Sequence, residues 1–278
     1  MYSPKIRKLL IIFLIIGWAG TAVFLSSRKP VKPKSLTSPD VSISSINSKR
    51  TVELLSEAIA CLKLRKDNEG LALFNEVLAM DPFNLDALWG KAEIMRRRHK
   101  YSASEEILKR VIDENPTHAP SLVTLAYIKY SDNKINEALE LTNQVIKRGS
   151  DDKDDIALAY MMLGAINSKR CSDGWLFGKI KYGTQIKRNF EKAKEISPDL
   201  SETHLCMGTF YLKAPAIAGG DLDKAIEELN IAYKMTPDFA TVNVRLAQAY
   251  KKKGDLDKYN YYLKRAKELD PENEFLNE

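Results

Sequence analysis

Histidine and cysteine are the side chains most suited to catalysis or metal binding, and this sequence contains few of them. The chain has three histidines and three cysteines among 278 residues. His204 and Cys206 lie two positions apart on a predicted helix, where side chains point about 200° apart and cannot share one metal ion. We interpret Cys206 as a small buried residue. Cys171 is the one candidate for a reactive thiol, and we predict no catalytic role for it because no histidine lies near it in the sequence.

Glycine-rich and acidic segments do not point to a phosphate or calcium site either. Gly219-Gly220 is not followed by the Gly-Lys-Ser/Thr of a phosphate-binding loop. The acidic run of residues 151–155 lacks the spacing and the central glycine of a calcium loop. It precedes a helix predicted to begin near Ile156, whose N-terminal dipole these charges complement. We therefore predict that the protein is not an enzyme and has no cofactor and no metal.

The basic character of the chain belongs to its N-terminal part. The formal net charge is +6, yet residues 1–50 hold nine basic residues and one acidic residue, giving +8. The remaining 228 residues hold 34 basic and 36 acidic residues, giving −2. A near-neutral body argues against nucleic-acid binding. Hydrophobic residues at 44% and charged residues at 29% are typical of a folded chain.

Residues 9–25 form an apolar segment without a charge. As a helix it would span about 25 Å, near the lower limit for crossing a bilayer. Three cations precede it in the tail of residues 1–8, and Gly20-Thr21-Ala22 could serve as a cleavage site, so a cleaved signal peptide is the alternative. We favour an uncleaved single-pass anchor, and a body that is extracytoplasmic (periplasmic) rather than cytoplasmic. Residues 26–50, rich in Ser, Pro and cations, are predicted to be a flexible linker.

The rest of the chain is periodic. Five prolines each follow an apolar helical stretch and stand in similar local sequences. They are Pro82, Pro116, Pro198, Pro237 and Pro271, at intervals of 34, 82, 39 and 34 residues. Proline lacks an N–H and disfavours helix at its predecessor, so each is predicted to follow a helix end. A period of 34 residues places units at about 51–84, 85–118, 119–152, 157–200, 201–239 and 240–273.

This pattern resembles the tetratricopeptide repeat family, whose unit is two antiparallel helices that cross at small residues. The matching small residues are Ala58, Ala92, Ala126, Gly164, Gly208 and Ala247 in first helices, and Gly70, Ser104, Ala138 and Ala225 in second helices. The resemblance covers nearly everything from residue 51 onward, although Ser150 replaces the closing proline of the third unit. It implies an all-α fold, an α-solenoid of about six helix-turn-helix units after the N-terminal transmembrane helix. For function it implies little beyond binding a partner.

Two units carry insertions. The fourth has about ten extra residues around 171–185, with an apolar and aromatic cluster that includes Trp175 and Phe177. We favour a longer helix hairpin over a partner-docking loop for this segment. In the fifth unit, residues 213–225 are predicted to form a rigid elbow in which the glycines adopt positive φ and Asp221 caps the next helix.

In the family that the sequence resembles, first helices line a concave face that binds ligands. The resemblance, with the fourth-unit insertion, implies these partner-binding candidates: Trp89, Arg96, Arg97, Tyr127, Tyr130, Lys169, Trp175, Phe177, Lys213 and Lys251. Cations recur near the ends of five first helices, which fits the helix dipole or, alternatively, a basic ledge for an acidic or extended segment. The clamp with which some members hold a C-terminal carboxylate is missing, because Leu55, Ile59 and Glu93 stand at its positions.

We therefore expect a membrane-tethered scaffold or adaptor that binds a protein partner through its concave groove. The alternative is a periplasmic accessory protein for transport or envelope-component handling. This alternative is suggested by the elbow of the fifth unit, which is similar to Gly-Gly elbows in some periplasmic tetratricopeptide proteins that partner transporters. The protein would then bind a transporter subunit, or a small solute beside Trp175 and Tyr211. Neither reading involves nucleic acid.

Overall fold

The computed structural model describes the backbone of residues 39–173 and 176–278, and the side chains of residues 48–173 and 182–278. By its internal contacts the chain divides into two units, Met1–Ile43 and Ser44–Glu278. In the first unit only residues 39–43 are described, with helical backbone. The second unit is an all-α solenoid.

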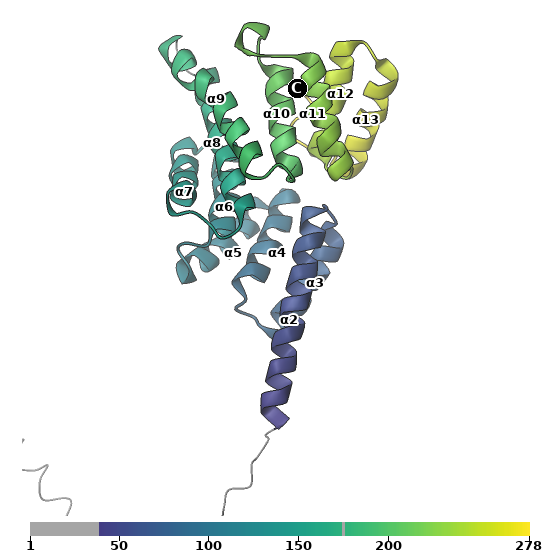
Figure 1. Ribbon diagram of the computed structural model, residues 1–278. Coiled ribbons are helices and arrows are strands. Elements are labelled where there is room, and N and C mark those ends of the chain that lie inside the picture. The colour runs from purple at the N-terminus through teal and green to yellow at the C-terminus, as the bar shows by residue number, and fades with distance from the viewer. Residues whose placement is uncertain (1–38, 174–175) are drawn as a thin grey trace, which may run out of the picture. The chain divides into compact units, whose positions relative to one another are not determined.

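Twelve α-helices and one short 3-10 turn make up the regular secondary structure of the described residues (Figure 1). Consecutive helices form six antiparallel pairs, as the sequence predicted. The pairs are α2 (Pro39–Lys63) with α3 (Asp67–Met80), α4 (Leu85–Arg97) with α5 (Tyr101–Glu114), α6 (Ala119–Ser131) with α7 (Ile135–Arg148), α8 (Lys153–Asp173) with α9 (Leu176–Ile196), α10 (Ser201–Lys213) with α11 (Leu222–Met235), and α12 (Ala240–Lys253) with α13 (Leu256–Leu269).

The N-terminal predictions need correction. The predicted anchor, residues 9–25, lies outside the described residues, and among residues 39–173 and 176–278 no helix is long and apolar enough to cross a membrane. This finding overturns the expected localisation as a single-pass membrane protein with an extracytoplasmic body. In addition, α2 begins at Pro39, within the segment predicted as a flexible linker. Proline is favoured as the first residue of a helix.

The helix crossings contain the small residues that the sequence indicated. Ala58, Ala92 and Ala126 of the first helices are fully buried, as are Ser104 and Ala138 of the second helices. Large side chains fill the space that glycines leave. A Cβ atom added to Gly90 would lie 2.1 Å from the ring of Phe74, and one added to Gly164 would lie 2.3 Å from the ring of Phe190. These aromatic rings therefore depend on glycine in the facing helix.

The closing prolines lie where the sequence placed them. The second helix of each proline-containing unit ends two residues before its proline, as α3 does at Met80 before Pro82. In the third unit, where proline is absent, Gly149 follows α7 with φ +81°. A residue without a Cβ adopts this conformation freely, so glycine here replaces proline as the device that ends the helix.

The two insertions have different structures. Helices α8 and α9 have 21 residues each, against 13 or 14 in α4 to α7, so the extra residues lengthen the hairpin. The elbow of the fifth unit contains the turn η1 (Ala216–Ala218), after which Gly219 has φ +95°. Gly220 lies so close to the preceding chain that a Cβ would clash with the carbonyl oxygen of Ala214. Asp221 accepts hydrogen bonds from two backbone N–H groups and caps α11, as predicted.

The glycine contacts generate a test with a matched pair. Gly90→Ala should destabilise the protein by about 1–3 kcal/mol, because the new methyl group overlaps the buried ring of Phe74. Gly70→Ala should be neutral or stabilising by up to about 1 kcal/mol, because its Cβ would find its nearest neighbours at 3.5 Å and alanine favours helix. Denaturant unfolding of both variants measures the difference. Equal destabilisation of the two would contradict this account of the crossings.

Candidate functional site

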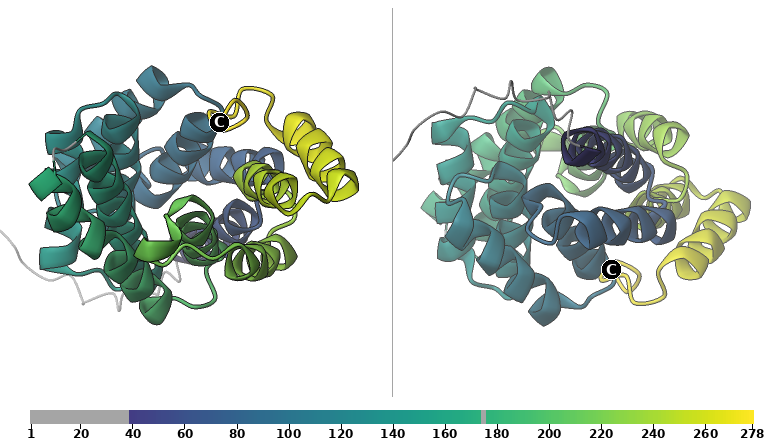
Figure 2. Two further views of the ribbon diagram at one scale, coloured as in Figure 1. Left: turned by 90° about the horizontal axis from the view of Figure 1, so that it is seen from above. Right: turned by 90° about the horizontal axis from the view of Figure 1, so that it is seen from below.

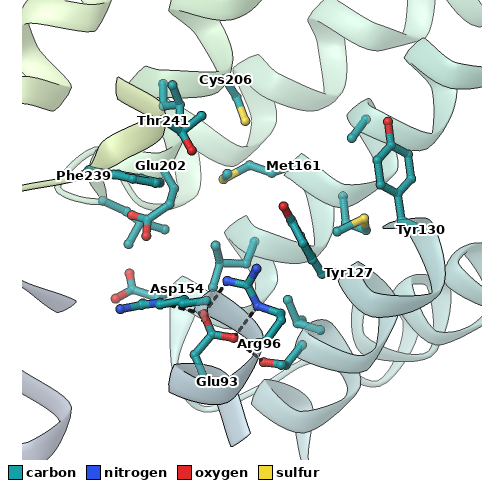
Figure 3. Close-up of a pocket in the computed structure, with 18 of the residues that line it drawn as sticks. Glu93, Arg96, Tyr127, Tyr130, Asp154, Met161, Glu202, Cys206, Phe239 and Thr241 are labelled. Carbon is teal, nitrogen blue, oxygen red and sulfur yellow. Dashed lines mark hydrogen bonds and ion pairs between the residues drawn. The ribbon is translucent and has the colours of Figure 1, made fainter. Parts of the chain in front are cut away.

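A cavity of about 2400 Å³ runs along the concave side of the solenoid. The first helix of every pair contributes to its wall, and the close-up in Figure 3 shows side chains from α4, α6, α8, α10 and α12 pointing into the same space. Lining residues from successive first helices include Ile59, Trp89, Tyr127, Met161, Leu205 and Arg245. The wall is therefore mixed, with aromatic and aliphatic side chains beside buried charges.

A carboxylate held by two arginines forms one part of this wall. Arg96 donates two hydrogen bonds to Glu93, at 2.8 and 2.6 Å, and Arg97 donates a third at 3.0 Å. Thr124 also donates to Glu93, and Trp89 donates to Thr124 through its indole N–H at 3.1 Å. Burial by itself raises the pKa of Glu93, but the neighbouring arginines outweigh it and hold that pKa far below its usual range. This glutamate is therefore ionised at neutral and at mildly acidic pH.

The arginines of this cluster also connect neighbouring repeats. Arg97 donates to the carbonyl oxygen of Leu62 at 2.9 Å and to Asp67 at 2.7 Å, both in the first pair. The guanidinium of Arg96 lies 4.1 Å from the centre of the Tyr127 ring in the third pair. The second pair is thereby tied to both of its neighbours through charged groups rather than through apolar packing alone.

A second group of contacts closes the solenoid on itself. Arg65, in the turn between α2 and α3, donates to Glu202 of α10 at 2.5 Å, and its guanidinium stacks 3.7 Å above the Phe239 ring. Lys63 donates to Asp154 of α8 at 2.6 Å. The first pair thus contacts the fourth and fifth pairs and the residue that precedes α12. Burial and the charge of Arg97 lower the pKa of Arg65 to about 10, so it remains a cation at neutral pH.

The turns that make such contacts have an unusual backbone. Arg65, His99 and Asn133 occur at intervals of 34 residues, each after a first helix, and each has a positive φ between 56° and 61°. Side chains other than glycine adopt this conformation at a cost, although asparagine tolerates it better than arginine. At two of these three turns, the residue reaches across the concave side to a distant part of the chain, Arg65 to Glu202 and His99 to Asp270. At these two turns, the unfavourable backbone conformation accompanies a long-range contact.

After α13 the chain turns back to the concave side instead of continuing outward. In both views of Figure 2 the C-terminal segment lies beside the α4 region. The segment of residues 270–278 contacts four helix pairs through side chains or main chain. Its contacts are His99 to Asp270 at 3.1 Å, Tyr127 to Glu274 at 3.0 Å, Asn273 to Thr241 at 3.2 Å, Gln248 to the carbonyl of Phe275 at 3.1 Å, and Arg245 and Lys213 to Glu278 at 2.6 and 2.9 Å.

The structure brings six of the ten candidate residues together. Trp89, Arg96, Arg97, Tyr127, Tyr130 and Lys213 line the cavity. Lys251 instead borders a smaller hollow of about 640 Å³ and lies 5.5 Å from the Tyr259 ring. Lys169 is paired with Asp173 on the surface of α8 and is not part of the cavity wall. Trp175, and the side chain of Phe177, lie outside the described residues.

The cations at the ends of first helices do not form a continuous basic ledge. Lys63 is paired with Asp154, and Arg96 and Arg97 with Glu93. Lys252 donates to the main chain of α10. Lys213 differs, because its partner is Glu278 of the C-terminal segment. Tyr211, suggested as part of a small-solute pocket, is not among the cavity-lining residues and packs against the core of α10 to α13.

Sequence reasoning missed the residues that define the ends of the cavity. Arg65, Glu202 and Arg245 were not singled out, because their partners lie between 33 and 137 positions away in the chain. Repeat periodicity describes contacts between neighbouring units and contains no signal for contacts across the superhelix. One signal was available for the C-terminal segment: after the last proline phrase the chain continues with Glu-Phe-Leu-Asn-Glu, which begins no further helix.

Comparison with known proteins agrees with this architecture. The model of the tetratricopeptide repeat family matches residues 55–119 and 216–274. A thermophilic tetratricopeptide repeat protein of Thermus thermophilus is 22% identical, with a TM-score of 0.56, and the match covers 69% of this chain and 95% of that one. A chain of the APC/C hetero-tetramer Cut9–Hcn1 is 16% identical, with a TM-score of 0.55, and the match covers 86% of this chain and 46% of that one. No curated protein matched the sequence.

Two stretches of the chain therefore match the tetratricopeptide repeat family, and the solved structures share the fold of the described residues. This fold is typical of scaffolds for protein–protein interaction, and proteins of this kind are generally not catalytic. The structural likenesses concern the fold alone.

The closure contact predicts a change of both stability and shape. Arg65→Met keeps an apolar stem but leaves Glu202 without its cation, which should cost about 3 kcal/mol of unfolding free energy. The same variant should increase the radius of gyration measured by small-angle X-ray scattering, because the first pair is released from the fifth. Lys66→Met is the control, since Lys66 is exposed and is paired with its near neighbour Glu69. A variant with unchanged unfolding and unchanged scattering would show that the contact does not hold the solenoid closed.

A buried carboxyl group near the cavity predicts a pH effect. Burial, together with the charges of Asp152 and Asp154, raises the pKa of Asp155 to about 6. This pKa lies above that of an unfolded aspartate, so the ionised form disfavours folding above about pH 6 and the penalty vanishes below about pH 4. Asp155→Asn should therefore be more stable than the parent at pH 8 and equal to it at pH 4, as measured by denaturant midpoints. The exposed Asp151→Asn variant should show no such trend.

Proposed function

We propose that this protein is an interaction scaffold that holds a segment of another protein in the concave cavity. The observation that supports this proposal most directly is the cavity itself, which is lined by the first helix of all six pairs. A volume of about 2400 Å³ exceeds the 300–1,000 Å³ typical of small-molecule pockets and suits a stretch of polypeptide.

The chemistry of the wall supports the same proposal. Aromatic side chains such as Tyr127 and Tyr130 provide apolar contact area with polar ends, a combination enriched in protein interfaces. Arg96, whose guanidinium lies against the Tyr127 ring, is already paired with Glu93, so these two charges shape the wall without demanding a partner. Within the described residues, no group of three or more His, Cys, Asp and Glu side chains is arranged to hold a metal ion. The tyrosines and the internally paired charges of the wall favour binding of a polypeptide segment.

Site-specific photo-crosslinking tests the proposal in cells. A photoreactive amino acid is placed at Val123 of α6 or Thr209 of α10, which both line the cavity, and at Tyr261, which is 58% exposed on α13 and does not line it. We expect one protein to be captured from both cavity positions and not from Tyr261, with the crosslinked peptide confined to one segment of that protein. Adducts that are identical at all three positions, or absent from both cavity positions, would contradict binding in the cavity.

A further inference from the structure

The C-terminal segment, residues 270–278, occupies part of the cavity wall in the manner of a bound peptide. It contains no regular helix or strand, and it is held through side chains of residues from the second, third, fifth and sixth pairs. Four of its nine residues are acidic and one is aromatic. Three of the acidic side chains accept from cavity-lining groups: Asp270 from His99, Glu274 from Tyr127, and Glu278 from Arg245.

Arg245 is the centre of this contact. It is 5% exposed, and its guanidinium donates to Glu278 at 2.6 Å while it lies 4.1 Å above the ring of Phe275. Its Nε atom is buried and has no hydrogen-bond partner. Lys213, from the neighbouring first helix, donates to the same glutamate. The carboxylate of Glu278 thus pairs with both cations of the wall, and the ring of Phe275 stacks on one of them.

Of these two cations, Arg245 favours an acidic occupant most strongly, because its side chain is 6% exposed whereas that of Lys213 is 42% exposed. Among the described residues, Glu278 is the one carboxylate paired with either Lys213 or Arg245. A buried cation without a counter-charge is disfavoured, so a replacement of similar chemistry at Arg245 favours departure of the segment from this part of the cavity. The segment can nevertheless be exchanged, because Glu274 and Glu278 are among its solvent-exposed residues, and contact with water weakens the ion pairs of a carboxylate.

From these observations we infer that residues 270–278 are an intramolecular stand-in for the partner. The partner segment is extended and acidic, with an aromatic residue between two glutamate or aspartate residues, and it binds at Lys213 and Arg245 by displacing the chain's own segment. This inference rests on the proposed function and specifies the chemistry of its ligand. It also means that the full chain binds such a segment more weakly than its wall alone would, because the tethered segment is present at a high effective concentration.

Fluorescence anisotropy with a defined probe tests the inference. The probe is a labelled peptide that copies residues 270–278, amidated at its end so that only side-chain carboxylates contribute. It is titrated with the full chain and with a release variant that carries Glu274→Gln, Phe275→Ala and Glu278→Gln. We expect the release variant to bind the probe about tenfold or more tightly than the parent. Binding should weaken at high salt, because exposed charges take part.

Matched variants assign the site. In the release variant, Arg245→Gln or Lys213→Ala should reduce probe binding by about tenfold or more. Lys253→Ala should not, because Lys253 is exposed, pairs with Asp223 and lines neither cavity. A control peptide with glutamine and alanine at the three changed positions should not bind. Unfolding midpoints of all variants confirm that they are folded, and the less buried Lys213 variant keeps the test valid if Arg245→Gln does not fold.

Two results would overturn the inference: equal binding of the probe to the parent and the release variant, or binding that is insensitive to both Lys213 and Arg245. Such results would leave the proposed function standing if Val123 and Thr209 still crosslink to one protein in cells. Loss of that crosslinking pattern, in contrast, would remove the proposed function itself. The two failures are therefore distinguishable.

Discussion

The contact of Arg65 with Glu202 and Phe239 is the interaction on which the shape of this solenoid depends. Helix pairs of a repeat protein pack against their neighbours through apolar faces, and that packing alone fixes only the local rotation from one pair to the next. Arg65 adds a contact between the first pair and the fifth pair, across the concave side. The concave surface thereby becomes a cavity with walls on several sides, and the residues that face it are held at fixed mutual distances.

Charged groups are used in this cavity in two different ways. Around Glu93 the charges are paired among residues of the helices, with Arg96 and Arg97 on Glu93 and Arg97 also on Asp67 of α3, and they form a rigid part of the wall. Around Arg245 and Lys213 the balance comes from a segment outside the helices. A self-satisfied cluster is a structural element, whereas a pair of cations neutralised by a loosely held segment is a place where one anion can be exchanged for another. This distinction, rather than the total charge, locates the part of the wall that is suited to recognition.

Much of the fold followed from the sequence, because the repeat encodes local structure at fixed spacing. The prolines marked the helix ends. The small residues at the crossings identified the first helix of every unit and the second helix of four units, including Gly70 and Gly164. The preference for a longer hairpin in the fourth unit agrees with the 21-residue helices α8 and α9. The local rules did not reveal that α2 extends back to Pro39, since a serine-rich composition that is usual for linkers does not prevent a helix from continuing.

The site was predictable only in part. Position within a first helix sufficed to place Trp89, Tyr127 and Lys213 on the cavity wall. It did not suffice to show what each cation is paired with, because those partners belong to other repeats or to the C-terminal segment. Arg65 and His99 lie in turns that look ordinary in the sequence. Their positive φ angles and their long-range partners become evident only when the superhelix is in view.

Closure of the ring has a consequence for how this unit unfolds. In an open repeat array each unit contacts only its neighbours, so the array loses structure progressively from its ends, where one side is always unprotected. Here Arg65 of the first pair contacts the fifth pair, and residues 270–278, which follow the sixth pair, contact the second pair through His99. The ends are therefore not the weakest points, and a local opening at either end removes contacts at both. Hydrogen exchange in such a molecule is expected to be protected as one cooperative block instead of grading from the middle outward.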